Sequence, residues 1–268
     1  MEPKIMICDL DGTLLTSDKR VTEKTIKAIR KVRDKGILFG ICSGRDVENI
    51  LSNLLKWHLE ELVDVIVGSG GAEVYSKPKR FLKRYGVLSK EAAKAIIGHF
   101  DNGHVNFGVP YGTTLKVKYD DDIIKYVTNI NLYHYEKTDY EELLKEDIPK
   151  ICVFCFEEDL DKLLEKSKSF PSEEYHCIGV QSGIYLMEYL CEGISKSEGL
   201  KNLAELHNLT LDDILAFGDA DNDYDMIMHA GIGVVMENGT PLTKSVADYI
   251  TDDNDHDGIV SFIEKYIL

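Results

Sequence analysis

Short apolar runs alternate with longer amphipathic stretches in the first and last parts of the chain. Each apolar run has the length of a buried strand, and each amphipathic stretch has apolar residues at helical spacing. Strands that alternate with helices are typical of parallel sheets with right-handed crossovers. The pattern therefore predicts an α/β fold whose core is a doubly wound, mostly parallel, Rossmann-like sheet. The strands expected in this core are 5–8, 37–42 and 214–217, and the helices are 22–35, 46–57 and one that starts at Lys196.

The middle of the chain, roughly residues 79–190, has a different pattern. Strand-like and helix-like segments do not alternate regularly here, which is typical of an α+β unit. We expect this unit to be inserted into the sheet domain, so that residues 1–82 and 188–268 form one domain and residues 83–187 form another. The strands expected in the insert are 115–119, 151–156, 178–180 and 185–189, and its helices are 90–100 and 160–169.

Two carboxylates follow the first predicted strand at the point where it ends. Asp9 and Asp11 lie two residues apart, and a loop at a strand end lets both side chains turn toward one point. Two negative charges that close need a cation or a shared proton, and Mg²⁺ is a hard ion that accepts carboxylate, water and phosphate oxygens. One acid could then attack phosphorus while the other moves protons. Taken alone, the run Asp9-Leu10-Asp11-Gly12-Thr13 also fits a simple turn, because Asp and Gly are common in turns.

Further polar groups follow the other predicted core strands. Ser43-Gly44-Arg45 follows strand 37–42, Lys196 opens a helical stretch, and a cluster from Gly218 to Asp223 follows the last strand. The carboxyl ends of parallel strands share one edge of a sheet, so these groups are expected to meet beside the first pair of acids. Each group alone also fits a plain structural role, as a helix entry or as a solvated acidic face near a helix N-terminus. Together, in this order, they predict a single active site.

These four motifs resemble those of the haloacid-dehalogenase-like (HAD) superfamily of phosphotransferases, and within it the Cof-type sugar-phosphate phosphatases. The resemblance covers both core parts nearly end to end, including the tail from Val235 to Val260, and it is weak between about residues 83 and 186. The chain has Gly70-Gly71 where the family usually has Asn-Gly, and Asn238-Gly239 where it usually has Asn-Ala. Both departures concern the rim of the active site. The resemblance implies a phosphatase core with a large inserted α+β cap that selects the substrate.

The resemblance also implies a role for each motif residue. Asp9 would be the nucleophile that forms an aspartyl-phosphate, and Asp11 the acid that protonates the leaving group and then the base that activates water. Mg²⁺ would be held by Asp9 and Asp219 and by the backbone carbonyl of Asp11. Asp223 would position Lys196 or the waters of the metal. The residues expected to hold phosphate oxygens are Ser43, Gly44, Lys196 and Asn222, whereas Arg45 is expected to pair with a carboxylate beside the site.

Two other functions remain open on the sequence alone. A phosphomutase of the same superfamily would use the same pair of aspartates to transfer phosphate between sugar positions. A non-hydrolytic signalling protein would also carry clustered aspartates on a parallel α/β sheet and take a phosphoryl group on one of them. The second acid and the long insert favour turnover of a small substrate, because a signalling phospho-aspartate needs no acid beside it and must stay accessible to its partner.

Composition narrows the possible partners. The chain has 268 residues, of which 44% are hydrophobic, so it can bury a sizeable core. Its net charge of −16 argues against nucleic acid as a partner and requires that a small phosphorylated metabolite be attracted locally by a metal or a nearby cation. The start lacks a signal-peptide pattern and no apolar run has the length of a membrane span, so we expect a cytoplasmic enzyme without a membrane partner. The oligomeric state stays open between monomer and dimer.

Three short patterns match known binding motifs by their letters. Asp253-x-Asp255-x-Asp257-Gly258 followed by Glu264 fits the EF-hand expression, but a strand-like segment precedes it, so we expect a loop that enters the last helix. Cys152 and Cys155 have the spacing of a zinc or redox pair, yet residues three apart on a strand point to opposite faces. Gly68-Ser69-Gly70-Gly71 resembles a dinucleotide loop and fits a tight strand connection better. We expect all six cysteines to be reduced.

Overall fold

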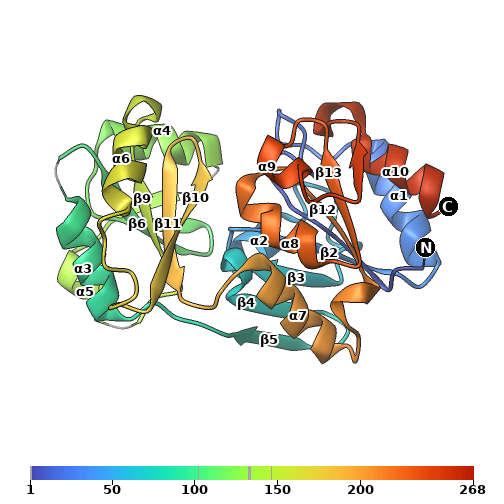
Figure 1. Cartoon of the computed structure of the whole chain (residues 1–268), viewed down its shortest axis with the longest axis horizontal. Coiled ribbons are helices and arrows are strands. Elements are labelled where there is room, and N and C mark those ends of the chain that lie inside the picture. The colour runs from blue at the N-terminus through green and yellow to red at the C-terminus, as the bar shows by residue number, and fades with distance from the viewer. Residues whose placement is uncertain (1, 102, 132–133, 146) are drawn as a thin grey trace. The chain divides into compact units, whose positions relative to one another are not determined.

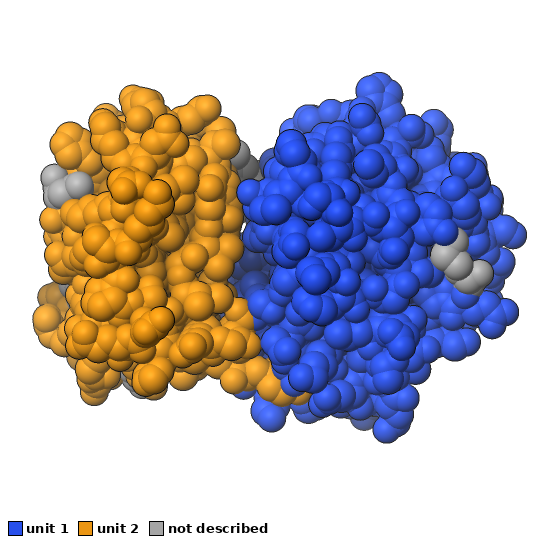
Figure 2. Space-filling model, viewed as in Figure 1, with its two compact units in different colours: residues 1–84, 195–268 blue, residues 85–194 orange. Residues whose placement is uncertain are grey.

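The computed structural model describes residues 2–101, 103–131, 134–145 and 147–268, and it divides into two compact units. One unit consists of Met1–Arg84 and Ser195–Leu268, and the other of Tyr85–Ile194 (Figure 2). The insert expected from the sequence, residues 83–187, begins close to the observed boundary and ends before it. The difference arises because β11 (Leu186–Cys191) pairs with strands of the inserted unit and not with the core sheet.

The first unit is built on one sheet with the strand order β14-β13-β12-β1-β2-β3-β4-β5 (Figure 1). The strands from β14 to β3 are parallel, and β4 and β5 extend the sheet in antiparallel fashion. β1 is therefore an interior strand, flanked by β12 and β2. The strands are β1 (Ile5–Cys8), β2 (Leu38–Cys42), β3 (Val65–Gly68), β4 (Glu73–Ser76), β5 (Phe81–Arg84), β12 (Ile214–Gly218), β13 (Ile232–Met236) and β14 (Tyr249–Thr251).

Helices cover both faces of this sheet. α1 and α10 pack side by side on one face (Figure 1), where Ile29 and Ile263 join a core cluster with Ile66 of β3. α7 lies against the opposite face, because its Gly199 packs on Val67, the next residue of the same strand. The sheet is thus doubly wound, as the alternation of strands and helices predicts. The helices of this unit are α1 (Glu23–Asp34), α2 (Val47–Asn53), α7 (Lys196–Leu206), α8 (Tyr224–His229), α9 (Pro241–Lys244) and α10 (Gly258–Tyr266).

The second core helix is shorter than the sequence pattern indicates. α2 begins after its cap Asp46 but ends at Asn53 instead of continuing to Trp57. The chain turns there because His58 takes a left-handed conformation with φ 58°, and the amide of Leu59 bonds back to the end of the helix. This turn buries Trp57 and Leu59 in the core. The apolar spacing that suggests a longer helix therefore reflects burial of a compact turn.

The inserted unit has its own sheet, with the order β10-β11-β9-β6-β7-β8. β7 and β8 are parallel, and the other neighbours are antiparallel, so this unit is α+β as predicted. No helix in the described part of the chain is long and apolar enough to cross a membrane. The remaining elements are β6 (Asn106–Tyr111), β7 (Thr114–Val117), β8 (His134–Lys137), β9 (Ile151–Phe154), β10 (Cys177–Gly183), α3 (Lys90–Phe100), α4 (Asp122–Asn131), α5 (Tyr140–Leu143) and α6 (Leu160–Ser167).

Strand β9 confirms the interpretation of the closely spaced cysteines. Cys152 belongs to the apolar cluster beneath α4, whereas Cys155 belongs to the cluster beneath α3, on the other face of the sheet. All six cysteines are free thiols in the structure. The neighbouring strand β6 escapes the sequence pattern, because Gly108 and Pro110 interrupt an otherwise buried apolar run.

Candidate active site

Three polar residues follow neighbouring parallel strands and therefore meet at one edge of the core sheet. Asp9 follows β1, Ser43 follows β2 and Asp219 follows β12. The backbone amide of Asp9 donates to the carbonyl of Phe217 at 2.8 Å, and that of Ser43 donates to the carbonyl of Val67 at 2.9 Å. Asp9 and Ser43 thus still belong to the strand ladder at the point where their side chains leave the sheet. The topology brings together residues from opposite ends of the chain.

Lys196 links Asp9 to Asp223 in a buried charged cluster. Its amine donates to Asp9 Oδ1 at 2.6 Å and to Asp223 Oδ1, and all three side chains are buried. The second oxygen of Asp223 accepts hydrogen bonds from the amides of Asp219 at 2.9 Å and Ala220 at 3.0 Å. Asp223 therefore fixes both the lysine and the loop that carries Asp219.

The start of α7 sets the position of Lys196. Ser195 caps the helix by accepting a hydrogen bond from the amide of Glu198 at 3.3 Å. The Ser195 carbonyl lies so close to Gly71 that a Cβ on this glycine would be 1.8 Å from it, and Gly71 has φ 112°. A residue with a side chain does not fit there. The segment Gly68-Ser69-Gly70-Gly71 is thus a tight connection between β3 and β4 that packs against the helix carrying the lysine.

The acidic side chains at this edge form a group suited to a divalent cation. Asp9, Asp219 and Asp223 each place a carboxylate oxygen within 4.8 Å of the others. Because both oxygens of Asp223 are already bonded, Asp9 and Asp219 have the lone pairs that remain for a cation. Thr13 donates to Asp219 Oδ1 at 2.6 Å, and Gly12 makes room for the other oxygen, since a Cβ there would lie 2.5 Å from it. Carboxylates beside backbone carbonyls are the ligands that hard cations bind.

Burial changes the protonation of this group. It raises the pKa of Asp9 well above its ordinary value; Lys196 opposes the rise, and Asp223 and Asp219 add to it. Burial and the charge of Asp223 likewise raise the pKa of Asp219 to about 7. Burial alone would lower the pKa of Lys196, but the carboxylates of Asp223 and Asp9 outweigh it and raise that pKa, so the amine stays charged. Carboxyl groups with raised pKa values keep their protons until a bound cation displaces those protons.

Asp11 faces two cations instead of the acidic group. Its carboxylate accepts hydrogen bonds from Arg45 Nε at 3.0 Å and from Lys19 Nζ at 2.7 Å. Burial alone would raise the pKa of Asp11, but the charges of Arg45 and Lys19 outweigh it and hold that pKa below its ordinary value. Arg45 thus pairs with a carboxylate beside the site, as expected from the sequence. Asp11 is ionised in this conformation.

The remaining predicted site residues lie on loops at the same strand ends. Ser43 is buried, and its hydroxyl accepts a hydrogen bond from the amide of Arg45 at 3.2 Å. Gly44 follows it in the loop to α2. Asn222 is half-buried in the short turn Asp221–Asp223 after β12. The structure therefore brings the predicted residues together on the loops after β1, β2 and β12 and at the start of α7.

Lys19, Thr13 and Asn238 also contact this site, although the sequence prediction includes none of them. Lys19 pairs with Asp11, Thr13 with Asp219, and the side-chain amide of Asn238 donates to the carbonyl of Gly12 at 2.8 Å. Thr13 belongs to the same run as the first two acids, which is a usable signal. Asn238 has a weaker signal, because the family resemblance places Asn238-Gly239 at the rim of the active site. Lys19 carries no signal, because its approach to the site depends on how its loop folds.

The EF-hand-like run does not converge on one point. Asp253 accepts hydrogen bonds from amides of its own turn, Asp255 from Ser17, and Asp257 from the hydroxyl of Thr22. Each carboxylate thus faces a different partner. The run is the loop that enters α10, as the sequence indicates.

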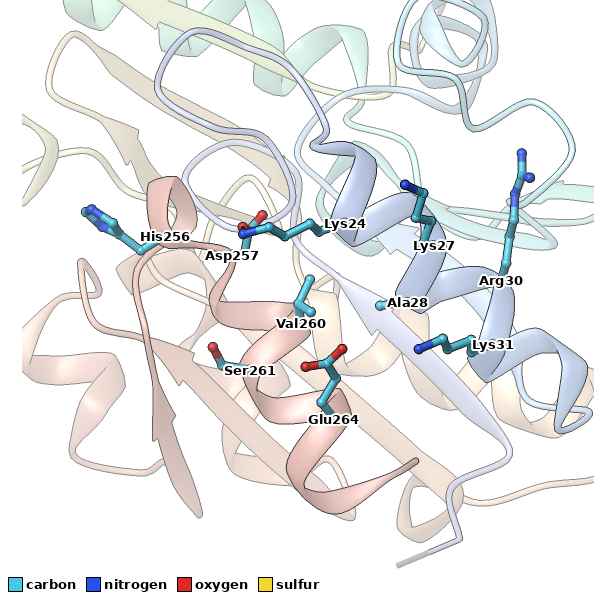
Figure 3. A pocket seen from close by; sticks show the side chains of 10 residues that line it. All are labelled: Lys24, Lys27, Ala28, Arg30, Lys31, His256, Asp257, Val260, Ser261 and Glu264. Carbon is cyan, nitrogen blue, oxygen red and sulfur yellow. Dashed lines mark hydrogen bonds and ion pairs between the residues drawn. The ribbon is translucent and has the colours of Figure 1, made fainter.

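A groove of about 670 Å³ lies between α1 and α10 (Figure 3). Its lysine and arginine side chains come from α1, whereas His256 and the acidic residues Asp257 and Glu264 come from the opposite side. Lys24 forms an ion pair with Asp257 at 2.9 Å, and Arg30 points away from α10 (Figure 3). None of the predicted site residues lines this groove. Its cations are opposed by acids, in contrast to the converging acids at the strand ends.

A comparison with known protein families agrees with the geometry at the strand ends. The model of the haloacid dehalogenase-like hydrolase family matches residues 6–263. The chain belongs to this family. It is therefore a HAD-type hydrolase, and its predicted membership and enzyme class are confirmed.

Two relatives of this HAD-type hydrolase are named as phosphatases. The chain is 28% identical to 5-amino-6-(5-phospho-D-ribitylamino)uracil phosphatase YitU of Bacillus subtilis, over 99% of this chain and 98% of the relative. It is 25% identical to the HMP-PP phosphatase of Klebsiella pneumoniae, over 98% of this chain and 96% of the relative. Both comparisons run through the core and the insert, so the HAD relatives share both parts.

Solved structures of HAD proteins have the same fold. A haloacid dehalogenase-like hydrolase from Bacteroides thetaiotaomicron superimposes with a TM-score of 0.86 at 25% identity, over 98% of this chain and 99% of that one. The HAD subclass IIB sugar phosphatase BT4131 superimposes with a TM-score of 0.85 at 23% identity, over 98% of both chains. This second likeness concerns the fold alone. The predicted α/β core with an inserted α+β unit is thereby confirmed.

Proposed function

We propose that this HAD-type hydrolase is a Mg²⁺-dependent phosphatase of small phosphate monoesters, with sugar phosphates as its main substrates, and that it acts through an aspartyl-phosphate on Asp9. The observation that carries the proposal is the buried arrangement of Asp9 between Lys196 and Asp219 at the edge of a parallel sheet. A carboxylate in this position has a fixed cation on one oxygen and room for a second cation beside it. Both features suit attack on a negatively charged phosphoryl group.

Asp9 and Asp219 are the side chains that would hold Mg²⁺, together with the backbone carbonyl of Asp11. When bound, the metal would neutralise charge on the carboxylates and on the phosphate oxygens. Asp223 would act through Lys196 and through the amides of the Asp219 loop, because both of its oxygens are already bonded there. The raised pKa values of Asp9 and Asp219 support this assignment, since a divalent cation relieves the repulsion that burial imposes.

The chemistry would proceed in two displacements at phosphorus. In the first, an oxygen of Asp9 forms a bond to phosphorus as the bond to the alkoxide breaks, and Asp11 gives its proton to that alkoxide. In the second, Asp11 takes a proton from water, the water oxygen bonds to phosphorus, and the bond between phosphorus and the Asp9 oxygen breaks. Inorganic phosphate leaves, and the Asp9 carboxylate is restored. The hydroxyl of Ser43, the amide of Gly44 and the side chain of Asn222 would hold the phosphate oxygens.

The acid step sets a condition on Asp11. Its carboxylate is ionised here because Arg45 and Lys19 hold it. To donate a proton, it must first take one up from solvent or from the substrate's phosphate group, which requires that it leave at least one of these cations when the substrate arrives. The negative charge of a phosphate group competes for the same cations, so substrate binding itself favours this release.

The insert would select the substrate, as a cap does in the Cof-type group. This part of the proposal is supported by the phosphatase relatives, which share the insert and whose names specify small phosphorylated compounds. The net charge of −16 also disfavours nucleic acid as a substrate.

A phosphate-release screen tests the proposed function. The whole chain is incubated with Mg²⁺ and a panel of sugar phosphates, nucleotides and phosphorylated vitamins, and both free phosphate and isomerised substrate are measured. We expect free phosphate from sugar phosphates and none from the Asp9→Asn variant. Asp122→Asn, an exposed substitution of the same kind on α4, is the control and should behave as wild type. Isomerised product without free phosphate would identify a mutase, and activity of Asp9→Asn within tenfold of wild type would refute the nucleophile.

A further inference from the structure

A set of contacts between two loops has no part in the chemistry proposed above. The first loop, residues 10–22, carries Asp11 from β1 to α1 and is called the Asp11 loop here. The second loop, residues 252–257, leads from β14 to α10 and contains the EF-hand-like aspartates. Asn238, which follows β13, joins them. We call the side chains of Asn238, Asn254 and Asp255 the clasp.

The clasp bonds the Asp11 loop at three successive places. The side-chain amide of Asn238 donates to the carbonyl of Gly12 at 2.8 Å, that of Asn254 donates to the carbonyl of Leu15 at 2.9 Å, and Asp255 accepts from the amide and hydroxyl of Ser17 at 2.8 and 2.6 Å. Two residues of the clasp also bond each other, because the backbone amide of Asn254 donates to Asn238 Oδ1 at 3.2 Å. These bonds lie on the chain directly after Asp11.

The loop that carries the clasp is itself fixed. Asp253 accepts hydrogen bonds from the amides of Asp255 and His256, both at 2.9 Å, and closes the turn. Asp257 has φ 57°, and a Cβ on Gly258 would lie 1.8 Å from the carbonyl of residue 252, so the backbone has little freedom. Asp257 is tied in turn to α1 by its ion pair with Lys24 (Figure 3). The clasp therefore acts as a rigid support for its neighbour.

The clasp adds to the bonds that the Asp11 loop makes within itself, where the amide of Thr16 donates to the carbonyl of Arg20 at 2.9 Å and that of Lys19 to the carbonyl of Thr16 at 2.8 Å. The amide of Leu14 donates to the carbonyl of Asp9 at 3.2 Å, and that of Leu15 donates to Leu10 at 2.8 Å. The Gly12 and Leu15 carbonyls and the Ser17 amide are bonded by the clasp instead. The clasp therefore ties this part of the Asp11 loop to a second loop of the core. A small displacement of an acid from its place can slow a reaction strongly.

We propose that the clasp positions Asp11 for proton transfer, with Asn254 and Asp255 as positioning residues that act through the Asp11 loop. The inference rests on the proposed function, in which Asp11 is the acid and base. It also explains why an aspartate-rich run at the far end of the chain has side chains that diverge. Asp255 bonds the amide and hydroxyl of Ser17 in the Asp11 loop, Asp257 bonds the side chains of Thr22 and Lys24, and Asp253 closes the turn itself.

Leaving groups distinguish a positioning role from a structural one. Phenolate is a basic leaving group, since its conjugate acid resembles tyrosine with a pKa of about 10, so its departure is helped by an acid. p-Nitrophenolate is a weaker base and leaves without a proton. Loss of the clasp should therefore slow the hydrolysis of phenyl phosphate much more than that of p-nitrophenyl phosphate. General damage to the fold or to the metal site would slow both equally.

The experiment measures kcat and KM for both esters with the whole chain and Mg²⁺. We expect Asn254→Ala and Asp255→Ala to lower kcat/KM for phenyl phosphate by about tenfold, a part of what a general acid supplies, and to leave kcat/KM for p-nitrophenyl phosphate within about twofold. The ratio kcat/KM is compared because it ends at departure of the leaving group, whereas kcat also contains the breakdown of the aspartyl-phosphate, in which Asp11 would act as base for both esters. Asp255→Asn keeps an oxygen that accepts from Ser17 and should recover most of the loss. Asp252→Ala is the matched control, because Asp252 lies in the same loop and bonds Ser261 of α10.

Asp11→Asn separates failure of the inference from failure of the proposed function. If Asp11→Asn shows the leaving-group difference and the clasp variants do not, the inference is overturned and the role of Asp11 stands. If Asp11→Asn lowers kcat/KM equally for both esters, the acid role fails, and the inference fails with it. An equal loss of kcat/KM on both esters in the clasp variants, with unchanged circular dichroism, also overturns the inference.

Discussion

Two groups of aspartates in the same unit behave in opposite ways. Asp9, Asp219 and Asp223 are far apart in the sequence, yet their oxygens converge within 4.8 Å around a buried lysine. Asp253 and Asp255 lie close together in a run that fits a calcium motif, yet their carboxylates bind separate partners at the surface. Convergence is therefore a property of the sheet, which aligns strand ends, and close spacing along the chain does not supply it.

The pKa values of the two groups of aspartates are shifted in opposite directions. Burial raises the pKa of Asp219 to about 7, with the charge of Asp223 adding to it. At the surface, the hydrogen bonds from Ser17 lower the pKa of Asp255, and the contact with His256 lowers that of Asp253. The buried group is thus under strain as long as no cation is bound, whereas the exposed group gains from being ionised.

The largest difference between the two groups is expected when the lysine that contacts each group is replaced. Lys196→Met leaves Asp9 and Asp223 buried without their cation, so we expect loss of activity and of about 3–5 kcal/mol of unfolding free energy in metal-free protein. Lys24→Met removes the exposed partner of Asp257 and should leave the unfolding curve unchanged within error. Urea unfolding in EDTA, followed by circular dichroism, measures both. Similar losses in the two variants would contradict the assignment of a buried ionic cluster.

The next largest contrast concerns the metal. Asp219→Asn removes a charged ligand, so the Mg²⁺ concentration needed for half-maximal phosphatase activity should rise by about 100-fold or more. Asp257→Asn removes a charge from the EF-hand-like run and keeps a residue type that tolerates a left-handed backbone, so that concentration should not change. Activity titrated against Mg²⁺ gives both values. A larger effect from Asp257→Asn than from Asp219→Asn would mean that the EF-hand-like run, and not the acidic group at the strand ends, binds the metal.

A third prediction uses pH. The folded-state pKa of Asp219 is raised to about 7, so the folded protein binds a proton that the unfolded chain releases near pH 4. The unfolding free energy of metal-free protein should therefore fall as the pH rises between these values, on the order of 2 kcal/mol from about pH 5 to about pH 7. Saturating Mg²⁺ should remove this slope. Denaturant unfolding at a series of pH values, with EDTA or with Mg²⁺, measures it, and a slope of the opposite sign would refute the raised pKa.

The smallest effect is expected at the surface. Because the pKa of Asp253 and of Asp255 is lowered, their stabilising bonds are complete above the ordinary aspartate pKa and are lost as the pH falls through the lowered value. Carboxyl carbon NMR of metal-free protein should show these two residues titrating below an ordinary aspartate and Asp219 titrating well above it. If all three titrated together, the electrostatic contrast between the two groups would not exist.

The sequence predicts the site well where strand ends determine it. Asp9, Ser43 and Asp219 each follow an apolar run whose length and order reveal the parallel sheet, and the motif spacing adds Lys196 and Asp223. It does not reveal Lys19, and it places Asn238 at the rim of the site without its contact to Gly12, because these contacts arise from loops whose conformation depends on distant partners. In the insert, β6 is hidden by Gly108 and Pro110, and β8 has mostly exposed residues that leave no apolar pattern.

The packing of Gly71 on Ser195 has a consequence for how this chain can evolve. Lys196 comes directly after the inserted unit in the sequence, yet its place is set by a turn of the core that contacts the helix start. The segment between Arg84 and Ser195 can therefore be lengthened, shortened or exchanged without moving the lysine. Under the proposed function, one insert could therefore replace another while Lys196 keeps its contact with Asp9, so that substrate preference could change without loss of activity.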